Sequence, residues 1–299
     1  MALPLPTSLS PSKVSAFKDC ALAFRFSAID RLPEPPSEPA VKGTTVHRAL
    51  ELLFGLEPYE RTPPMAQECL AEALVEMHQN PEFTELALGD DARAAFAADA
   101  ASMVDRYFTL EDPRAINPVG LEMMLEADVG GVLVRGIIDR LEESPDGSLV
   151  VTDYKTGRTP SIAQEQSRLG GVHFYAFLCQ KVLGRLPERI QLVYLGRDPQ
   201  VITTTPSQQS VRGVEQKVGA IWSAVVRACE HEDFRPKQSA LCNWCSFQAF
   251  CPVYGGDPDE ARAIALARQD TAQHHDGALV GDDALAGDDA LAGGRAAAS

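Results

Sequence analysis

Apolar residues recur at helical spacing through most of the first third of the chain. Ser10 and Pro11 have the N-cap and first-turn chemistry of a helix that we expect to continue to about residue 29. A proline-rich loop follows. Further amphipathic stretches lie at 41–54, 65–79 and 90–109. The pattern predicts a mainly helical N-terminal region.

From about residue 119 the apolar pattern changes to that of short strands. Three strand-like runs are separated by Gly130-Gly131 and by a Ser-Pro-Asp-Gly turn, an arrangement typical of an antiparallel meander. The runs that follow predict a helix, two more strands and a long helix, at about 165–183, 189–195, 201–205 and 208–229. This order predicts an α/β fold, a mixed sheet flanked by helices, in one domain over residues 1–256.

The last part of the chain has few bulky residues. It contains the tandem repeat GDDALAGDDALAGG, made of small and acidic residues. Such composition cannot bury enough apolar surface to form a core. We therefore expect residues 257–299 to be a disordered acidic tail.

The net charge of −15 argues against a surface that binds DNA strongly throughout. The body remains acidic without the tail, with 33 acidic against 24 basic residues. Bound cations at a cluster of these acids would reverse the local field. The sequence has neither a signal peptide nor an apolar run long enough to cross a membrane. It thus predicts a soluble cytoplasmic protein whose seven cysteines are reduced thiols or metal ligands.

Two carboxylates and an amine lie on adjacent predicted strands. Asp153 and Lys155 project to one face of their strand, and Asp139 could face them from the strand before. Paired carboxylates repel unless a cation lies between them, which favours a Mg²⁺ or Mn²⁺ site. Alternatively, Asp139 pairs with Arg140, and the other two form an exposed ion pair.

His47 is the candidate imidazole ligand for such a cation. It shares one face of a predicted helix with Glu51, which could bind the cation directly or through water. A His–Glu pair at this spacing also occurs as a purely structural helix pair.

Cys242, Cys245 and Cys251 form a C-x₂-C-x₅-C cluster that lacks a fourth thiolate. Cys20, near the other end of the chain, is the best candidate for that ligand. Spacing alone does not decide between zinc and a [4Fe–4S] cluster. The other three cysteines are expected to be small buried hydrophobes: Cys69, Cys179 and Cys229.

Six segments, in this order, resemble the RecB-like branch of the PD-(D/E)XK nucleases. That branch includes the AddB nuclease domain and the CRISPR-associated RecB-like exonucleases. The segments are SPSKVSAFKDC, GTTVHRALE, RGIIDR, VTDYKTG, HFYAF and CNWCSFQAFC.

The resemblance implies a restriction-endonuclease-like mixed sheet and a metal-dependent DNA nuclease. It further implies a nuclease that acts on DNA ends in repair or recombination, and a single-strand exonuclease is the leading hypothesis. Because the sequence has no G-x-x-x-x-G-K-(S/T) phosphate loop, a separate helicase is the expected partner. The metal ligands would be His47, Asp139, Asp153 and the Tyr154 carbonyl. Lys155 would be catalytic, and Tyr175 a supporting residue. Cys20, Cys242, Cys245 and Cys251 would hold a [4Fe–4S] cluster rather than zinc, stapling the two ends of the chain.

The sequence also departs from this family's pattern. Ala21 replaces a proline after Cys20, and Gly171 stands where a glutamine is usual, with Gln164 and Gln166 out of register. These departures keep an alternative open, a non-catalytic Fe–S protein that binds nucleic acid or a recombination partner. A zinc-stapled structural module is a third hypothesis.

Overall fold

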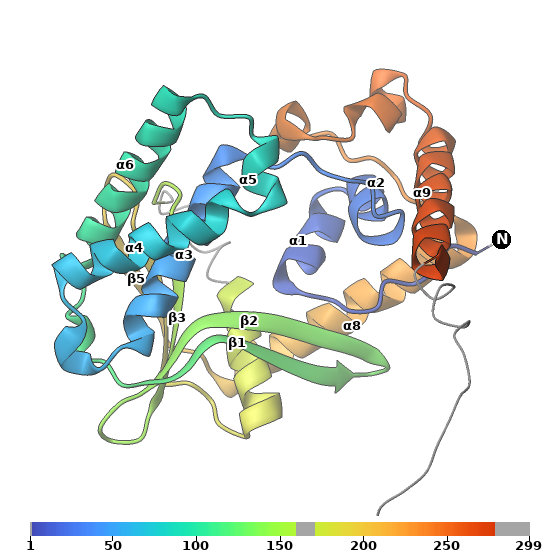
Figure 1. Cartoon of the computed structure of the whole chain (residues 1–299). Coiled ribbons are helices and arrows are strands. Elements are labelled where there is room, and N and C mark those ends of the chain that lie inside the picture. The colour runs from blue at the N-terminus through green and yellow to red at the C-terminus, as the bar shows by residue number, and fades with distance from the viewer. Residues whose placement is uncertain (1, 160–170, 279–299) are drawn as a thin grey trace, which may run out of the picture.

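The computed structural model describes residues 2–159 and 171–278 (Figure 1). Its centre is a five-stranded sheet in the order β1-β2-β3-β4-β5. The strands are β1 (Pro118–Val129), β2 (Val132–Glu143), β3 (Leu149–Lys155), β4 (Arg189–Tyr194) and β5 (Gln200–Thr204). Neighbours are antiparallel except β3 and β4, which are parallel. The predicted mixed sheet is thus confirmed.

Helices precede, flank and follow the sheet. They are α1 (Pro11–Asp19), α2 (Ala21–Phe24), the π-helix η1 (Arg25–Ile29), α3 (Glu38–Gly55), α4 (Pro63–His78), α5 (Pro81–Glu85), α6 (Asp90–Tyr107), a helix over residues 171–178 that continues into the π-turn η4 (Cys179–Leu183), α8 (Gln208–His231) and α9 (Pro258–Ala278). Short 3₁₀ turns are η2 (Pro58–Glu60), η3 (Pro113–Ala115), η5 (Ala240–Trp244), η6 (Gln248–Phe250) and η7 (Pro252–Tyr254). Within the described residues, none of the helices combines the length and apolar character needed to cross a bilayer.

Two cores lie on opposite sides of the sheet. The α3-side core joins α3, α4 and α6 to the strands and includes Leu50, Leu53, Leu70, Val104, Tyr107, Tyr154 and Val193. The α8-side core joins α8 and the helix over residues 171–178 to the strands and includes Val134, Ile138, Leu141, Val151, Phe177, Val211 and Val214. These apolar contacts hold the helices against the strands that carry the candidate site.

The meander forms where the sequence predicts it. Gly130 and Gly131 both have positive φ, 62° and 86°, which suits the tight turn between β1 and β2. The crossover from β3 to β4 passes through the helix over residues 171–178, so β4 runs parallel to β3. The rest of the helix predicted from about residue 165 lies outside the described residues.

The first predicted helix is interrupted at Cys20. Ser10 caps α1 as expected, since its hydroxyl accepts a hydrogen bond from the Lys13 amide at 3.2 Å. Cys20 itself is extended (φ −159°, ψ 110°) between α1 and α2. The amide of Lys237 donates to the Cys20 sulfur at 3.5 Å. The break therefore turns a thiol toward the C-terminal part of the chain.

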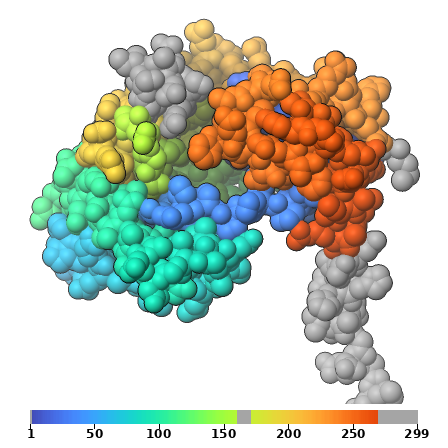
Figure 2. Space-filling model, turned by 90° about the horizontal axis from the view of Figure 1, so that it is seen from above, coloured from blue at the N-terminus to red at the C-terminus, as the bar shows by residue number. Residues whose placement is uncertain are grey.

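The two ends of the described chain share a third, terminal core. It includes Leu22, Phe24, Phe26, Val225, Phe234, Phe247 and Ala261. Figure 2, a view from above, shows the orange C-terminal segment lying against the blue N-terminal residues. Loss of these contacts would expose the apolar faces of both ends.

The prediction of disorder from residue 257 is wrong for the beginning of that segment. Residues Pro258–Ala278 form α9, where Ala261 and Ala265 are 0% and 6% exposed in the terminal core. Small residues four apart share one helical face and allow close packing, a signal that the low-complexity composition obscured. The tandem acidic repeat lies outside the described residues.

Candidate functional site

At Glu122, the side chains of β1 switch from facing the α3-side core to facing the α8-side core. Leu121 packs against the α3-side core, whereas Met123, two residues later, packs against the α8-side core. Residues two apart in a regular strand face the same side. Glu122 has a φ of 40°, a left-handed conformation that costs energy for residues other than glycine and is common at functional sites.

β2 makes the same change directly opposite. Ile138 packs in the α8-side core, whereas Arg140 donates to the hydroxyls of Tyr107 and Tyr154 in the α3-side core. The strand register on either side of this point pairs Glu122 with Asp139. Both strands therefore bend at one pair of acidic residues, which places their carboxylates together between the two cores.

His47 approaches this acidic pair from α3. Its Nδ1 atom lies 3.5 Å from Asp139 Oδ2 and 3.9 Å from Glu122 Oε1. Ligand atoms of these three side chains all lie within 4.8 Å of one another. The His47 Nε2 atom is 3.1 Å from the Tyr154 carbonyl. With the hydrogen on Nε2, this contact orients the ring and leaves Nδ1 as the ligand atom, the usual support for a metal-binding histidine.

β3 completes the site beside Asp139. The amide of Tyr154 donates to Asp139 Oδ2 at 2.7 Å. Asp153 is 3% exposed and forms an ion pair with Lys155. The hydroxyl of Tyr175, in the helix over residues 171–178, donates to Asp153 Oδ1 at 3.3 Å. Asp153 lies outside the group of three ligand atoms that His47, Glu122 and Asp139 form, but its charge acts on Asp139.

Burial and mutual repulsion raise the pKa values of two acidic groups in the site, Asp139 and Glu122. Burial raises the pKa of Asp139 to about 6, and the nearby Asp153 charge adds to the shift, whereas His47 opposes it. Burial likewise raises the pKa of Glu122 to about 7, with further contributions from Asp139, Glu51 and Asp153. Groups that resist ionisation together are stabilised by a cation among them.

The alternative pairing of Asp139 with Arg140 does not occur. Arg140 is fully buried and contacts Glu111 at 2.9 Å and Glu142 at 3.1 Å. The Asp153–Lys155 pair is not a solvated surface pair either, because its carboxylate is buried. Glu51 forms an ion pair with Arg48 at 2.9 Å and lies outside the group of three ligands.

Sequence reasoning missed Glu122. An acidic residue in the apolar run before GIIDR was the available signal, but its role depends on a strand register and a left-handed residue that no local pattern specifies. Gly171 lies one helical turn before Tyr175, and nothing within 4 Å would meet a Cβ there. Gln164 and Gln166 lie outside the described residues.

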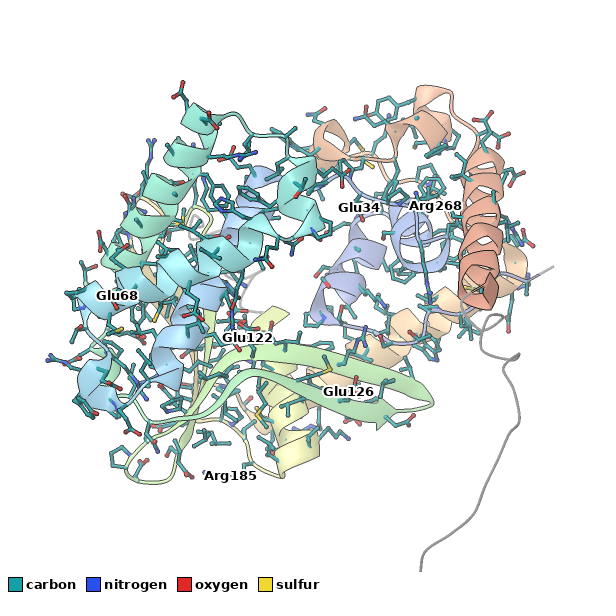
Figure 3. All side chains as sticks on the ribbon, viewed as in Figure 1. Glu34, Glu68, Glu122, Glu126, Arg185 and Arg268 are labelled. Atoms are coloured by element: carbon teal, nitrogen blue, oxygen red, sulfur yellow. The ribbon has the colours of Figure 1, made fainter. Side chains whose placement is uncertain are left out.

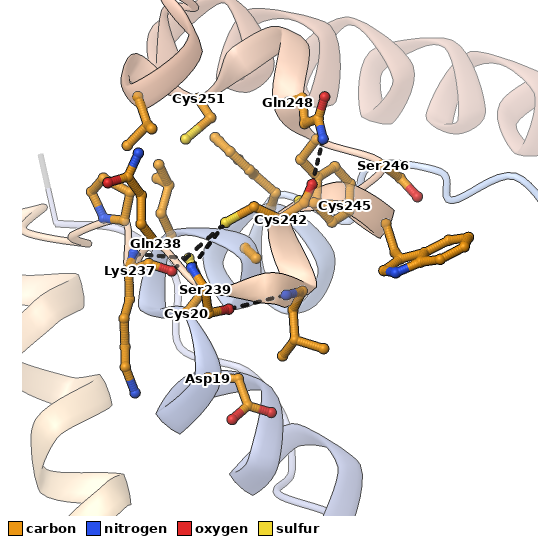
Figure 4. A pocket seen from close by; sticks show the side chains of 18 of the residues that line it. Asp19, Cys20, Lys237, Gln238, Ser239, Cys242, Cys245, Ser246, Gln248 and Cys251 are labelled. Atoms are coloured by element: carbon orange, nitrogen blue, oxygen red, sulfur yellow. Dashed lines mark hydrogen bonds between the residues drawn. The ribbon is translucent and has the colours of Figure 1, made fainter. Parts of the chain in front are cut away.

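The four predicted cysteine ligands line one cavity of about 350 Å³. Figure 4 shows Cys20 facing the loop that carries Cys242, Cys245 and Cys251. Amides of Lys237 and Ser239 donate to the sulfurs of Cys20 and Cys242 at 3.5 and 3.4 Å. The three other cysteines are buried elsewhere, as predicted: Cys69, Cys179 and Cys229.

The spacing of these sulfurs bears on which group they fit. A tetrahedral zinc with Zn–S bonds of about 2.3 Å brings its sulfurs to about 3.8 Å of one another. Among the residues that the structure describes, no three cysteine sulfurs lie within 4.8 Å of one another. An iron–sulfur cluster spreads its thiolates farther apart, because each binds a different iron. The four cysteines thus share a cavity, but their sulfurs form no metal-ligand group among the described residues.

The chain is similar to several known proteins. The gene 69 protein of Mycobacterium phage D29 is 21% identical over 270 residues, which cover 82% of this chain and 96% of that protein. A solved structure of a candidate exonuclease from Eubacterium rectale is 11% identical, with a TM-score of 0.47 over 80% of this chain and 87% of that one. The family model of the PD-(D/E)XK nuclease superfamily matches residues 8–252. This match covers most of the chain and every candidate site residue, so the chain belongs to the PD-(D/E)XK nuclease superfamily.

Proposed function

We propose that this protein is a divalent-metal-dependent deoxyribonuclease of the RecB-like branch, acting as an exonuclease on single-stranded DNA ends. The observation that carries the proposal is the convergence of His47, Glu122 and Asp139 on one point beside Asp153 and Lys155. The chain belongs to the PD-(D/E)XK superfamily, whose nucleases act on phosphodiesters. The domain that performs the reaction is proposed to span residues 1–256, with a separate helicase supplying unwound strands.

Each side chain then has a defined task. His47, Glu122 and Asp139, whose ligand atoms lie within 4.8 Å of one another, would hold Mg²⁺ or Mn²⁺ together with Asp153. The ion would supply polarisation of the scissile phosphate and a lowered pKa of water. Lys155 keeps its amine next to Asp153, where it can position the attacking water and offset charge on the phosphate. Tyr175 restrains Asp153 through its hydroxyl. The Tyr154 carbonyl, which the resemblance gives as a ligand, has an orienting contact with His47.

We also propose a [4Fe–4S] cluster on Cys20, Cys242, Cys245 and Cys251. Its support is the common cavity and the amide donors to two sulfurs. Because Cys20 lies between α1 and α2, the cluster would tie the N-terminal helices to the C-terminal loop. Its proposed role is structural.

A cleavage assay on end-labelled DNA tests the nuclease proposal. The full chain, purified without oxygen, should shorten single strands in Mg²⁺ or Mn²⁺ and be inactive in EDTA. Lys155→Met should lower the rate by at least about 100-fold, the scale for loss of one electrostatic group at a reacting centre. Arg114→Met is the matched control, because Arg114 forms an exposed ion pair with Asp112 outside the candidate site. Equal rates for the parent and Lys155→Met would contradict the proposal.

A further inference from the structure

An exposed apolar strip begins beside the metal site. Met124, Ile137 and Leu133 are 54%, 44% and 37% exposed, and Met124 is the cross-strand partner of Ile137. They lie on the outer face of the β1–β2 hairpin, whose other face packs in the α8-side core. The strip starts two residues beyond Glu122 on β1 and two before Asp139 on β2. Figure 3 places Glu122 near α3, with Glu126 farther along the hairpin.

A basic cluster lies beside this strip, with Arg135 between Ile137 and Leu133 on β2. The Arg135 amide donates to the Leu9 carbonyl at 2.9 Å, which brings the start of α1 alongside β2. From α1, Lys13 donates to the Ser8 carbonyl at 3.1 Å. Burial lowers the pKa of Lys13, and the positive charges of Arg135 and Arg31 lower it further. Lys13 and Arg135 are thus linked through residues 8 and 9, and the charge of Arg31 also acts on Lys13. We call these three residues the basic cluster.

The cations of this basic cluster have no ion-pair partner among the described residues, although the protein is acidic. None of the ion pairs found within 4.0 Å among the described residues includes Lys13, Arg31 or Arg135, although the chain carries a net charge of −15. Glu126 is the cross-strand partner of Arg135, and the two form no ion pair at that distance. Uncompensated cations next to a site for phosphodiesters are the expected footprint of a nucleic-acid backbone.

The dimensions suit a short stretch of nucleic acid. Arg135 lies four positions before Asp139, a distance of about 13 Å at about 3.3 Å per strand residue. That length corresponds to about four stacked nucleotides at about 3.4 Å each, or fewer in an extended strand. Apolar side chains can contact the faces of unpaired bases, which a duplex would cover by stacking. The strip and the basic cluster therefore fit a single strand better than a duplex.

We propose that the outer face of the β1–β2 hairpin is a binding site for single-stranded DNA, with bases on the apolar strip and phosphates on the basic cluster. The inference deepens the proposed nuclease function, because this strand leads into the metal site. The hairpin would thereby select unpaired ends and hold them in register with the cation ligands.

Binding measured without cleavage tests this site separately from the reaction. Fluorescence anisotropy of a labelled single strand, with the full chain in EDTA, should give a Kd that rises about tenfold in Arg135→Gln. The slope of log affinity against log salt should fall by about 0.7, the value for one phosphate contact of a single strand. Ile137→Ser should weaken binding and leave that slope unchanged. Arg212→Gln is the control, an equal charge change at an exposed position of α8.

The outcomes separate the two proposals. A parent protein that cleaves DNA, with Arg135→Gln and Arg212→Gln binding equally well, would overturn the hairpin site and leave the nuclease standing. A parent protein that binds single strands through Arg135 but never cleaves them would support the hairpin site and overturn the nuclease proposal. Equal affinity of the parent for a blunt duplex would refute the selection of unpaired bases.

Discussion

The amide of Tyr154 donates a 2.7 Å hydrogen bond to the Oδ2 atom of Asp139. This bond joins β3 to β2 at the point where Asp153 and Lys155 flank the donor. The same carboxylate atom lies 3.5 Å from His47 Nδ1. One oxygen thus fixes the relative positions of a helix and two strands, so any change at Asp139 affects both geometry and charge.

Two substitutions at Asp139 should separate these effects. Asp139→Asn removes the charge but keeps an oxygen that can accept from Tyr154, so cleavage should fall by at least about 100-fold with little change in stability. Asp139→Ala also leaves the buried Tyr154 amide unpaired, which should lower the free energy of unfolding by about a further 1–3 kcal/mol. Cleavage rates and urea unfolding of the two variants check this. An Asn variant that cleaves at the parent rate would exclude Asp139 as a ligand.

The stability of the metal-free protein should fall with rising pH because of Glu122. Its folded-state pKa is raised from 4.5 to about 7, so its contribution is fully present below pH 4.5 and is lost as the pH rises toward 7. In EDTA, the melting temperature of the parent should therefore fall relative to that of Glu122→Gln between pH 5 and 8. Mn²⁺ should restore the parent at pH 8. Parallel curves for the two proteins would mean that Glu122 does not titrate in this window.

Arg140 should be essential for stability although it lies behind the site. Its guanidinium bonds both oxygens of Glu111 at 2.9 and 3.1 Å and the Tyr154 hydroxyl at 2.7 Å. Arg140→Met would leave Glu111 largely buried without its cation, a loss of about 3–5 kcal/mol. Arg114→Met removes an exposed pair with Asp112 and should cost less than about 1 kcal/mol. Urea unfolding measures both, and equal losses would contradict the role of burial.

The elements and the main site residues were predictable because local periodicity and spacing determine them. His47 follows from a helical face, and Asp153 and Lys155 from alternation along a strand. Glu122 and Arg140 were not predictable in the same way. The first depends on a left-handed residue where two strands change sides. The second depends on polar groups of five residues: Tyr107, Glu111, Glu142, Thr152 and Tyr154. The break at Cys20 was likewise not predicted. The contact of its sulfur with the Lys237 amide joins residues more than 200 positions apart, which no local pattern specifies.

Metal analysis of a Cys20→Ser variant tests whether the two ends of the chain share a metal centre. Protein purified without oxygen should contain iron and sulfide and absorb in the visible range, and Cys20→Ser should lose both with little zinc in either protein. Because Cys20 lies between α1 and α2, the same variant should expose the N-terminal helices to proteolysis. Cys69→Ser, at a buried thiol of the α3-side core, should keep its iron whatever its stability. Stoichiometric zinc without sulfide would replace the cluster by a zinc site, and full iron content in Cys20→Ser would remove Cys20 from the ligand set.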